Sequence, residues 1–267
     1  MPIILSNFIL IFFLLTGSLK AQNYSELIID KNGKIIHQHN MKAIIHPASL
    51  TKLMTIYLTF HALKKGYLTL DDQLTISKKA NAQPASKIGL KAGEVITVKE
   101  ALNALIVKSA NDASMVLAES LAPSEWNFTE LMNIRAKKLG MHHSYFRNSS
   151  GLHYDDQITT AYDIGRLAFY LKKHFPEYYH MFADTSFKYK NKIFTSHNRV
   201  LLNYKYAEGM KTGYTKKSGF NLITSAASED QEFIAVIAGA NNAKTRDKRM
   251  IEMLDQAFQN KKITNYY

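Results

Sequence analysis

The spacing of hydrophobic residues near the start of the chain changes from the period of a strand to that of a helix. Two short apolar segments, SELIID and KIIHQHN, flank the dipeptide Asn32-Gly33, which is typical of the tight turn of a β-hairpin. From Ser49 onward, apolar residues recur every three or four positions up to Gly66. This spacing predicts a helix over residues 49–65 that ends at Gly66.

The middle of the chain returns to helical spacing after an irregular stretch. Residues 67–97 hold only short apolar segments and predict no long element. Three later segments have the period of a helix: residues 97–122, 126–141 and 159–175. The first is interrupted near residues 109–111, the second ends at Gly140, and the third has Thr159 or Thr160 as its N-cap.

The last third of the chain has the pattern of strands. Three β-rich segments, GMKTGYT, GFNLITSAAS and QEFIAVIAGA, are separated by short polar turns, and a helix over residues 245–259 follows them. With two strands at the start, the pattern predicts an α+β fold whose antiparallel sheet is formed by both chain ends, with a helical block between. No Pro-, Gly- or Ser-rich linker divides residues 22–267, which we interpret as a single domain.

Residues 1–21 predict the signal peptide of an exported protein. They carry no charged side chain before Lys20, a dense apolar run from Phe8 to Leu15, and a break near Ala21. An uncleaved anchor is the alternative, although eight consecutive apolar residues fall short of a membrane span. A buried core helix is the weaker alternative, because the segment has no polar face. We expect the periplasm or cell envelope, with no stable membrane anchor if the leader is cleaved.

The chain is strongly basic, with 34 Lys and Arg against 22 Asp and Glu and a formal net charge of +12. Such an excess favours polyanionic surroundings such as nucleic acid, anionic lipid or acidic wall polymers. The lysines are scattered and form no arginine-rich stripe, so nucleic acid is not the expected partner. Cysteine is absent, which excludes disulfides and thiol catalysis, and the ten histidines form no HExxH motif. We expect no metal and no cofactor.

Three short motifs follow one another along the chain: Ser49-Leu50-Thr51-Lys52, Ser109-Ala110-Asn111 and Lys211-Thr212-Gly213. In a helix, Ser49 and Lys52 lie one turn apart on the same face. Burying the charged amine of a lysine against the core costs free energy, so a lysine at this position indicates a function. Each motif alone is weak. Their joint occurrence, at a predicted helix start, an interhelical loop and a strand start, is a strong indication of serine acyl transfer.

The motifs and their surroundings resemble those of serine-type D-Ala-D-Ala carboxypeptidases, the low-molecular-mass penicillin-binding proteins of the S11 peptidase family. The segments PASLTKLMT, KSANDASM and EGMKTGYTKKSGFNL carry the resemblance most specifically, and NSSGLHYDDQITTAYDIGRLA adds to it. The resemblance covers residues 25–260, nearly the whole chain after the leader. It implies a DD-peptidase/β-lactamase-like fold, peptidoglycan stem peptides as substrates, and β-lactam antibiotics as covalent inhibitors.

The resemblance assigns the first two motifs to catalysis. Lys52, its pKa lowered by burial and by Lys211, would take the proton of Ser49 as that hydroxyl attacks the penultimate D-Ala carbonyl. Ser109 would relay a proton to the leaving amine, and Asn111 would hydrogen-bond the substrate backbone. The plain alternative for the first motif is an N-cap serine followed by a solvated lysine.

The third motif supplies the predicted substrate-binding strand. Lys211 would provide positive charge, Thr212 a hydroxyl, and Gly213 the room that a substrate needs to approach an edge strand. The resemblance places the oxyanion hole at the backbone N–H groups of Ser49 and Tyr214.

Three polar residues near the motifs have less specific roles. The resemblance makes Thr215 and Arg246 candidates for holding the terminal carboxylate of the substrate. A helix-surface role is equally open for Arg246, which follows the last predicted strand. Asp112 is interpreted as an acidic residue at a helix start.

The sequence departs from related enzymes in two places. No Glu-x-x-Leu-Asn stretch lies between Asn111 and Lys211, so we expect no rapid penicillin hydrolysis. The chain also stops soon after its final predicted helix, and we expect no C-terminal β domain or membrane-anchoring tail. The predicted function is that of a DD-carboxypeptidase. A DD-endopeptidase that cuts cross-bridges and a non-catalytic penicillin-binding wall protein are the alternatives, the second less favoured because all three motifs are intact.

Overall fold

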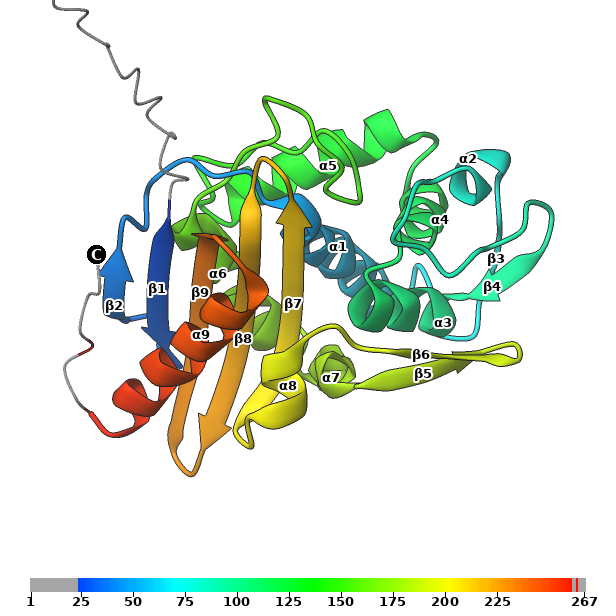
Figure 1. The fold of residues 1–267 in the computed structure, drawn as a ribbon. Helices are drawn as coiled ribbons and strands as arrows, with labels where there is room; N and C mark the ends of the chain where they lie inside the picture. The colour runs from blue at the N-terminus through cyan, green and yellow to red at the C-terminus, as the bar shows by residue number, and fades with distance from the viewer. Residues whose placement is uncertain (1–23, 261–262, 264–267) are drawn as a thin grey trace, which may run out of the picture.

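The computed structural model describes residues 24–260 and residue 263 (Figure 1). The predicted signal peptide, residues 1–21, lies outside this part of the chain. Within it, no helix is both long enough and apolar enough to span a membrane. A five-stranded sheet forms the centre of the described structure, with helices on both of its faces.

The sheet joins the two ends of the chain. Its strand order is β2-β1-β9-β8-β7, and every neighbouring pair is antiparallel. The strands are β1 (Ser25–Asp30), β2 (Ile35–His39), β7 (Ala207–Thr215), β8 (Gly219–Ser228) and β9 (Gln231–Ala240). Strand β1 pairs with β9 from Ser25↔Ala238 to Asp30↔Phe233. This pairing confirms the predicted α+β arrangement, and it leaves β7 at one edge of the sheet.

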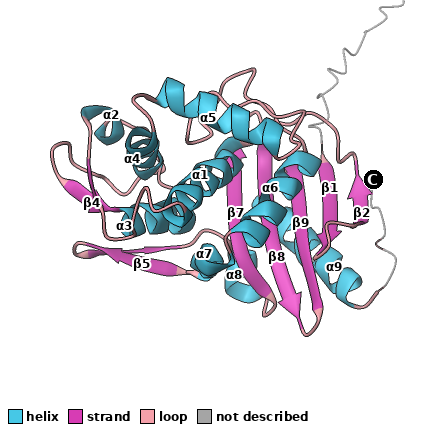
Figure 2. Cartoon of the chain, turned by 180° about the vertical axis from the view of Figure 1, so that it is seen from behind, coloured by secondary structure: helices cyan, strands magenta, loops and turns pink. Residues whose placement is uncertain are grey.

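Helices cover the two faces of the sheet unequally (Figures 1 and 2). Helix α9 (Ala243–Phe258) packs on one face, while α6 (Ala161–His174) packs on the other, next to α1 (Lys52–Lys64). The remaining helical elements are η1 (Ala48–Thr51), α2 (Lys78–Asn81), α3 (Val98–Asn103), the π-helix η2 (Ala104–Lys108), α4 (Asn111–Leu121), α5 (Glu125–Lys138), α7 (Pro176–Tyr179), η3 (His180–Ala183) and α8 (Arg199–Asn203).

The central strands contribute to two hydrophobic cores. Leu27 and Ile29 of β1 belong to the large core under the helical block, whereas Ile28 belongs to the smaller core under α9. Val236 and Ile237 of β9 divide in the same way. Because successive side chains of a strand point to opposite faces, a strand covered on both sides needs an almost unbroken apolar run. The segments LII and FIAVIA meet this requirement.

The hydrophobic pattern does not predict several short elements. Strands β3 (Gln73–Thr75) and β4 (Val95–Thr97) pair inside the stretch expected to be irregular, and β5 (Ser186–Tyr189) and β6 (Lys192–Thr195) form a hairpin. Each strand has three or four residues, which is too short for alternation to be told from a loop. Ser49 also lies in the 3₁₀ turn η1 and not at the start of the α-helix, which begins at Lys52.

A buried charged cluster ties the two ends of the described chain together. The Glu26 side chain of β1 is 1% exposed and accepts hydrogen bonds from both Nε and Nη2 of Arg249 on α9, at 2.7 and 2.8 Å. His37 of β2 and the Tyr24 hydroxyl bond the same carboxylate. Burial raises the pKa of Glu26, but these hydrogen bonds, led by that of Arg249, outweigh it and hold the pKa at about 2.

We expect the Glu26 cluster to make stability depend on pH in the acid range. The pKa of Glu26 lies below its ordinary value of 4.5, so its contribution, about 3 kcal/mol, is complete above pH 4.5 and is lost as the pH falls towards 2. Urea midpoints measured between pH 7 and pH 3 check this. Glu26→Gln should lower the midpoint at pH 7 and flatten its acid dependence, whereas Glu130→Gln on the exposed face of α5 should change neither. An unaltered acid dependence in Glu26→Gln would contradict the assignment.

Candidate active site

Ser49 lies in a turn that two other parts of the chain hold in place. Ala48 has a φ of +48°, a strained left-handed conformation for an alanine. A Cβ added to Gly151 would come within 1.8 Å of the Ala48 carbonyl oxygen, and one added to Gly213 within 3.2 Å of the Ser49 nitrogen. The sequence predicted that Gly213 leaves room for the substrate. In the structure, the lack of a side chain at Gly213 instead leaves room for the backbone of the Ser49 turn.

Lys52 places its amine beside the Ser49 hydroxyl. Its side chain is fully buried, and its Nζ lies 3.1 Å from Ser49 Oγ and 2.7 Å from Asn111 Oδ1. The third acceptor is the Ser150 carbonyl oxygen. Burial, and then the charge of Lys211, lower the pKa of Lys52 well below its ordinary value of 10.5. The solvated lysine considered as an alternative is therefore wrong, and a neutral amine here can accept the serine proton.

The loop of residues 148–152 supplies the Ser150 carbonyl that accepts a hydrogen bond from Lys52. Asn148 Oδ1 accepts hydrogen bonds from the backbone N–H groups of Ser150 and Gly151, at 3.1 and 2.6 Å. Glu125 Oε1 accepts hydrogen bonds from the backbone N–H and from the hydroxyl of Ser149. These bonds orient the Ser150 carbonyl towards the amine. Sequence reasoning assigned no role to Ser150, although the segment NSSGL that contains it is part of the family resemblance.

The second motif comes from the junction of the π-helix η2 and α4. Ser109 follows η2 as its C-cap, with a φ of +61°, and is half-buried, and Asn111 begins α4. Asn111 is fixed by three contacts: its backbone N–H donates to the Ser86 carbonyl, its Nδ2 donates to the Pro84 carbonyl, and its Oδ1 accepts from Lys52. The side-chain oxygen of Asn111 thus orients the amine of Lys52.

Lys211, from the third motif, lies close enough to Lys52 for its charge to act on the Lys52 amine. It lies on the edge strand β7, its side chain is 2% exposed, and its Nζ donates to the Thr212 carbonyl at 3.1 Å. Burial, and then the charge of Arg246, lower the pKa of Lys211 to about 7. Lys211 in turn lowers the pKa of Lys52. The fold therefore gathers Ser49, Lys52 and Lys211 from three distant parts of the chain.

The residues after the third motif continue along β7 into its turn. Tyr214 is 56% exposed, with its ring 4.2 Å from that of Phe220. The Thr215 hydroxyl accepts a hydrogen bond from the Ser218 backbone N–H, and the Thr215 N–H donates to the Ser218 hydroxyl. Thr215 is thus part of the β7–β8 turn, and its hydroxyl hydrogen stays available to a ligand.

A family model described as D-alanyl-D-alanine carboxypeptidase, Peptidase_S11, matches residues 16–242. The chain belongs to this peptidase family. D-alanyl-D-alanine carboxypeptidase DacF of Bacillus subtilis is 34% identical over 253 residues, which are 91% of this chain and 64% of DacF. The chain therefore spans less than two thirds of the length of that curated relative.

Solved structures of penicillin-binding proteins have the same fold. Penicillin-binding protein 6B from Escherichia coli superposes with a TM-score of 0.83 at 34% identity, covering 88% of this chain and 77% of that one. Penicillin-binding protein D2 from Listeria monocytogenes, in its cefotaxime-bound form, superposes with a TM-score of 0.80 at 26% identity, covering 89% of this chain and 97% of that one. The DD-peptidase-like fold class predicted from the sequence is confirmed.

Arg246 of this S11 peptidase is committed to internal partners. Its side chain is buried, at 4% exposure of the residue, so the helix-surface alternative is wrong. Its Nε and Nη2 donate to Asp247 Oδ1 at 2.9 and 2.6 Å, and its Nη1 donates to the Asn221 carbonyl at 3.2 Å. Arg246 acts on the site through its charge, which lowers the pKa of Lys211. Its role as a carboxylate ligand stays a prediction.

Asp112 does more than begin a helix. It lies in the first turn of α4 as expected, but it is fully buried and accepts hydrogen bonds from the backbone N–H groups of Ile88, Gly89 and Leu90. It thereby fastens the 84–90 loop, whose Pro84 carbonyl binds Asn111, against α4. These three partners are backbone groups more than 20 positions away, which no side-chain pattern reveals.

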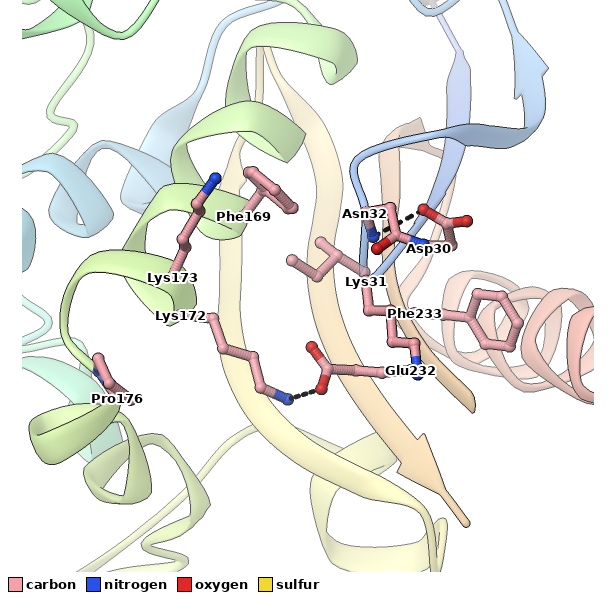
Figure 3. Close-up of a pocket in the computed structure, with 10 residues that line it drawn as sticks. Asp30, Lys31, Asn32, Phe169, Lys172, Lys173, Pro176, Glu232 and Phe233 are labelled. Atoms are coloured by element: carbon pink, nitrogen blue, oxygen red, sulfur yellow. Dashed lines mark hydrogen bonds and ion pairs between the residues drawn. The ribbon is translucent and has the colours of Figure 1, made fainter. Parts of the chain in front are cut away.

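A separate hollow of about 560 Å³ lies between α6, the β1–β2 turn and the start of β9 (Figure 3). Lys172 on its wall pairs with Glu208 at 2.6 Å and Glu232 at 3.0 Å. The hollow contains no residue of the three motifs.

Proposed function

We propose that this protein is a serine DD-carboxypeptidase that removes the terminal D-Ala from peptidoglycan stem pentapeptides through an acyl-enzyme on Ser49. The observation that carries the proposal is the buried Lys52 amine, with its lowered pKa, 3.1 Å from the Ser49 hydroxyl. A serine needs a neighbouring base to attack an amide, and a neutral amine at hydrogen-bond distance is such a base. Membership of the S11 family supports the same reaction.

Acylation begins with proton transfer from Ser49 Oγ to the neutral Lys52 amine. The Ser49 oxygen attacks the carbonyl carbon of the penultimate D-Ala, and the backbone N–H groups of Ser49 and Tyr214 stabilise the oxyanion. When the C–N bond breaks, Ser109 relays a proton to the leaving amine and D-Ala departs. Water then hydrolyses the Ser49 ester. Asn111 keeps Lys52 in place through its Oδ1, 2.7 Å from the amine.

The substrate peptide binds along β7, whose open edge can accept an added strand. Lys211 supplies the positive charge that attracts the substrate carboxylate and assists Ser109. Thr212, Gly213 and Tyr214 line the peptide, and Thr215 and Arg246 belong to the region that receives the terminal carboxylate.

The same site is expected to react with β-lactams, which are strained amides that acylate a serine without a departing amine. A penicillin-binding protein of the same fold has been solved with cefotaxime bound, which supports this partner. An envelope location follows from the substrate, because peptidoglycan lies outside the cytoplasmic membrane. The charge of +12 suits an acidic wall polymer.

Chromatography of muropeptides after incubation with purified wall distinguishes the proposed carboxypeptidase from a DD-endopeptidase. We expect pentapeptide monomers to lose one D-Ala while cross-linked dimers persist, with Ser49→Ala as the blank. Loss of dimers with pentapeptides intact would assign endopeptidase activity. No change in either would contradict an enzymatic role and favour a non-catalytic wall protein.

A further inference from the structure

A smaller hollow, of about 250 Å³, adjoins the one in Figure 3, between α6 and the β1–β2 turn. The two hollows share Asn32, Phe169 and Lys173, and Figure 3 shows Asn32 on the turn and the other two on α6. The smaller hollow adjoins β1, whereas the Ser49 turn packs against β7 at the other edge. Two strands, β9 and β8, lie between β1 and β7, so the two places are about 14 Å apart across the sheet.

One wall of the smaller hollow is a stripe of aromatic and basic side chains on α6. Its members recur every three or four residues, which places them on one side of the helix. They are Tyr162, Arg166, Phe169, Tyr170 and Lys173. Lys173 is exposed and the other four are half-buried. The stripe therefore faces solvent and is accessible to a ligand.

Arg166 is held in this wall by neutral acceptors. Its Nε donates to the Leu139 carbonyl at 3.0 Å, and its Nη1 and Nη2 donate to the hydroxyls of Tyr162 and Tyr170 at 3.2 and 3.5 Å. Two of its five N–H groups remain for a ligand. Both tyrosine hydroxyls act as acceptors in these bonds and keep their own hydrogens for donation.

Lys173 adds a second positive charge to the stripe. Its Nζ lies 5.6 Å from the centroid of the Phe169 ring. Among the residues that the structure describes, neither Lys173 nor Arg166 has a carboxylate within ion-pair distance. The acids of the larger hollow are engaged, since Asp30 accepts from two backbone N–H groups and Glu232 pairs with Lys172. Cations without a counter-ion favour an anionic ligand.

The floor of the smaller hollow is apolar, with an amide at its rim. Gly33 has a φ of +83°, and a Cβ added there would lie 3.5 Å from the Phe169 ring, so the ring packs close to the bare backbone of the turn. Ile29 completes the floor, and the Asn32 side chain adds an amide. An aromatic face surrounded by hydroxyls, an amide and two cations suits a sugar that carries a carboxylate. The C–H face of the sugar would pack on the ring, and the carboxylate would accept charge-assisted hydrogen bonds.

We propose that the smaller hollow binds a carboxylate-bearing amino sugar of the wall glycan, and so holds the polymer while one of its stem peptides reaches Ser49. This inference rests on the proposed function, in which the substrate is attached to a glycan chain. The two places lie on one molecule at opposite edges of a single sheet, so a polymer with many repeating units can occupy both.

Two matched sugars test the site: N-acetylmuramic acid and N-acetylglucosamine, which differ only in the lactyl ether that carries the carboxylate. Calorimetric titration of the full-length protein measures both affinities. We expect the wild type to bind the acid more tightly, and Lys173→Gln to reduce this preference by about tenfold, as expected for the loss of one charge-assisted hydrogen bond. Lys173→Arg should keep the preference. Phe169→Leu should weaken both sugars by a similar factor, about threefold or more, because it removes only the ring.

Lys248→Gln is the control, because it removes a positive charge from α9 on the opposite face of the sheet, where the side chain is 79% exposed. Its sugar affinities should equal those of the wild type. Equal affinities of the wild type for the two sugars, or an undiminished preference in Lys173→Gln, would overturn the inference. Lactate that binds as tightly as N-acetylmuramic acid would overturn it as well, because the hollow would then hold a bare anion.

Kinetics separate this site from the catalytic one. Lys173→Gln should raise KM for purified wall and leave kcat/KM for a soluble D-Ala-D-Ala peptide unchanged. An equal loss on both substrates would place the effect at Ser49 and contradict a separate glycan site. Failure of the wild type to release D-Ala from the soluble peptide would instead overturn the proposed function, and the sugar titration does not depend on that result.

Discussion

Replacing Ser49 with alanine is expected to abolish covalent labelling by benzylpenicillin and to lower kcat/KM for a D-Ala-D-Ala peptide by about 10⁴-fold or more. The Ser49 oxygen lies 3.1 Å from the amine of Lys52, and removing Oγ removes the atom that would form the acyl-enzyme bond. Intact-mass spectrometry after incubation with benzylpenicillin measures the label, and release of D-Ala measures turnover.

Ser120→Ala is the matched control for this experiment. Ser120 lies on α4, and its hydroxyl donates a hydrogen bond to the Leu117 carbonyl within the same helix, so the variant should label as fast as the wild type. The fold should survive in both variants, because Ser49 is half-buried and, among the residues that the structure describes, its hydroxyl hydrogen-bonds only the amine of Lys52. A covalent adduct that persists in Ser49→Ala would refute the assignment of the nucleophile.

Replacing Lys52 with methionine is expected to lower the acylation rate by about 10³-fold or more, since general-base assistance alone contributes factors of this size. Methionine keeps the length of the side chain and removes the amine, so Ser49 would have to attack without a proton acceptor. The second-order rate constant for benzylpenicillin labelling measures the effect. A rate within tenfold of the wild type would mean that another group takes the proton.

The pH dependence of acylation in the wild type tests the same role without a substitution. The pKa of Lys52 is lowered, so the neutral, proton-accepting amine becomes populated as the pH rises through that lowered value. Acylation should therefore increase with pH and level off well below pH 10.5, the ordinary pKa of lysine. A rate that kept increasing up to pH 10.5 would show an unperturbed lysine. In Lys52→Met this rising limb should disappear.

Much of the fold could be predicted from the hydrophobic pattern, because the pattern is a direct consequence of burial. The apolar runs of β1 and β9 required a sheet covered on both sides, and the helical periods of α1, α5 and α6 required an apolar surface to pack on. The hairpin β5–β6 escaped prediction, since strands of four residues with charged neighbours leave no measurable alternation.

Part of the candidate site could likewise be predicted from the sequence, and part could not. The three motifs could be recognised because each is short and continuous in the sequence. Ser150 could not, because it contributes a backbone carbonyl, which every residue has, and only the fold aims it at Lys52. The reason for Gly213 was also hidden, since the atoms that crowd it belong to a turn 164 positions away in the chain.

The amino-acid sequence by itself determined the order of elements, the chemical groups available and the family to which they belong, because these depend on local spacing and residue type. Only the tertiary structure decided the state of those groups. Whether Lys52 is neutral, whether Arg246 is free, and whether the pKa of Lys211 is lowered depend on burial and on charges brought from distant segments. Electrostatic interactions between these charges act through space, and the order of residues along the chain does not reveal which charges lie close together.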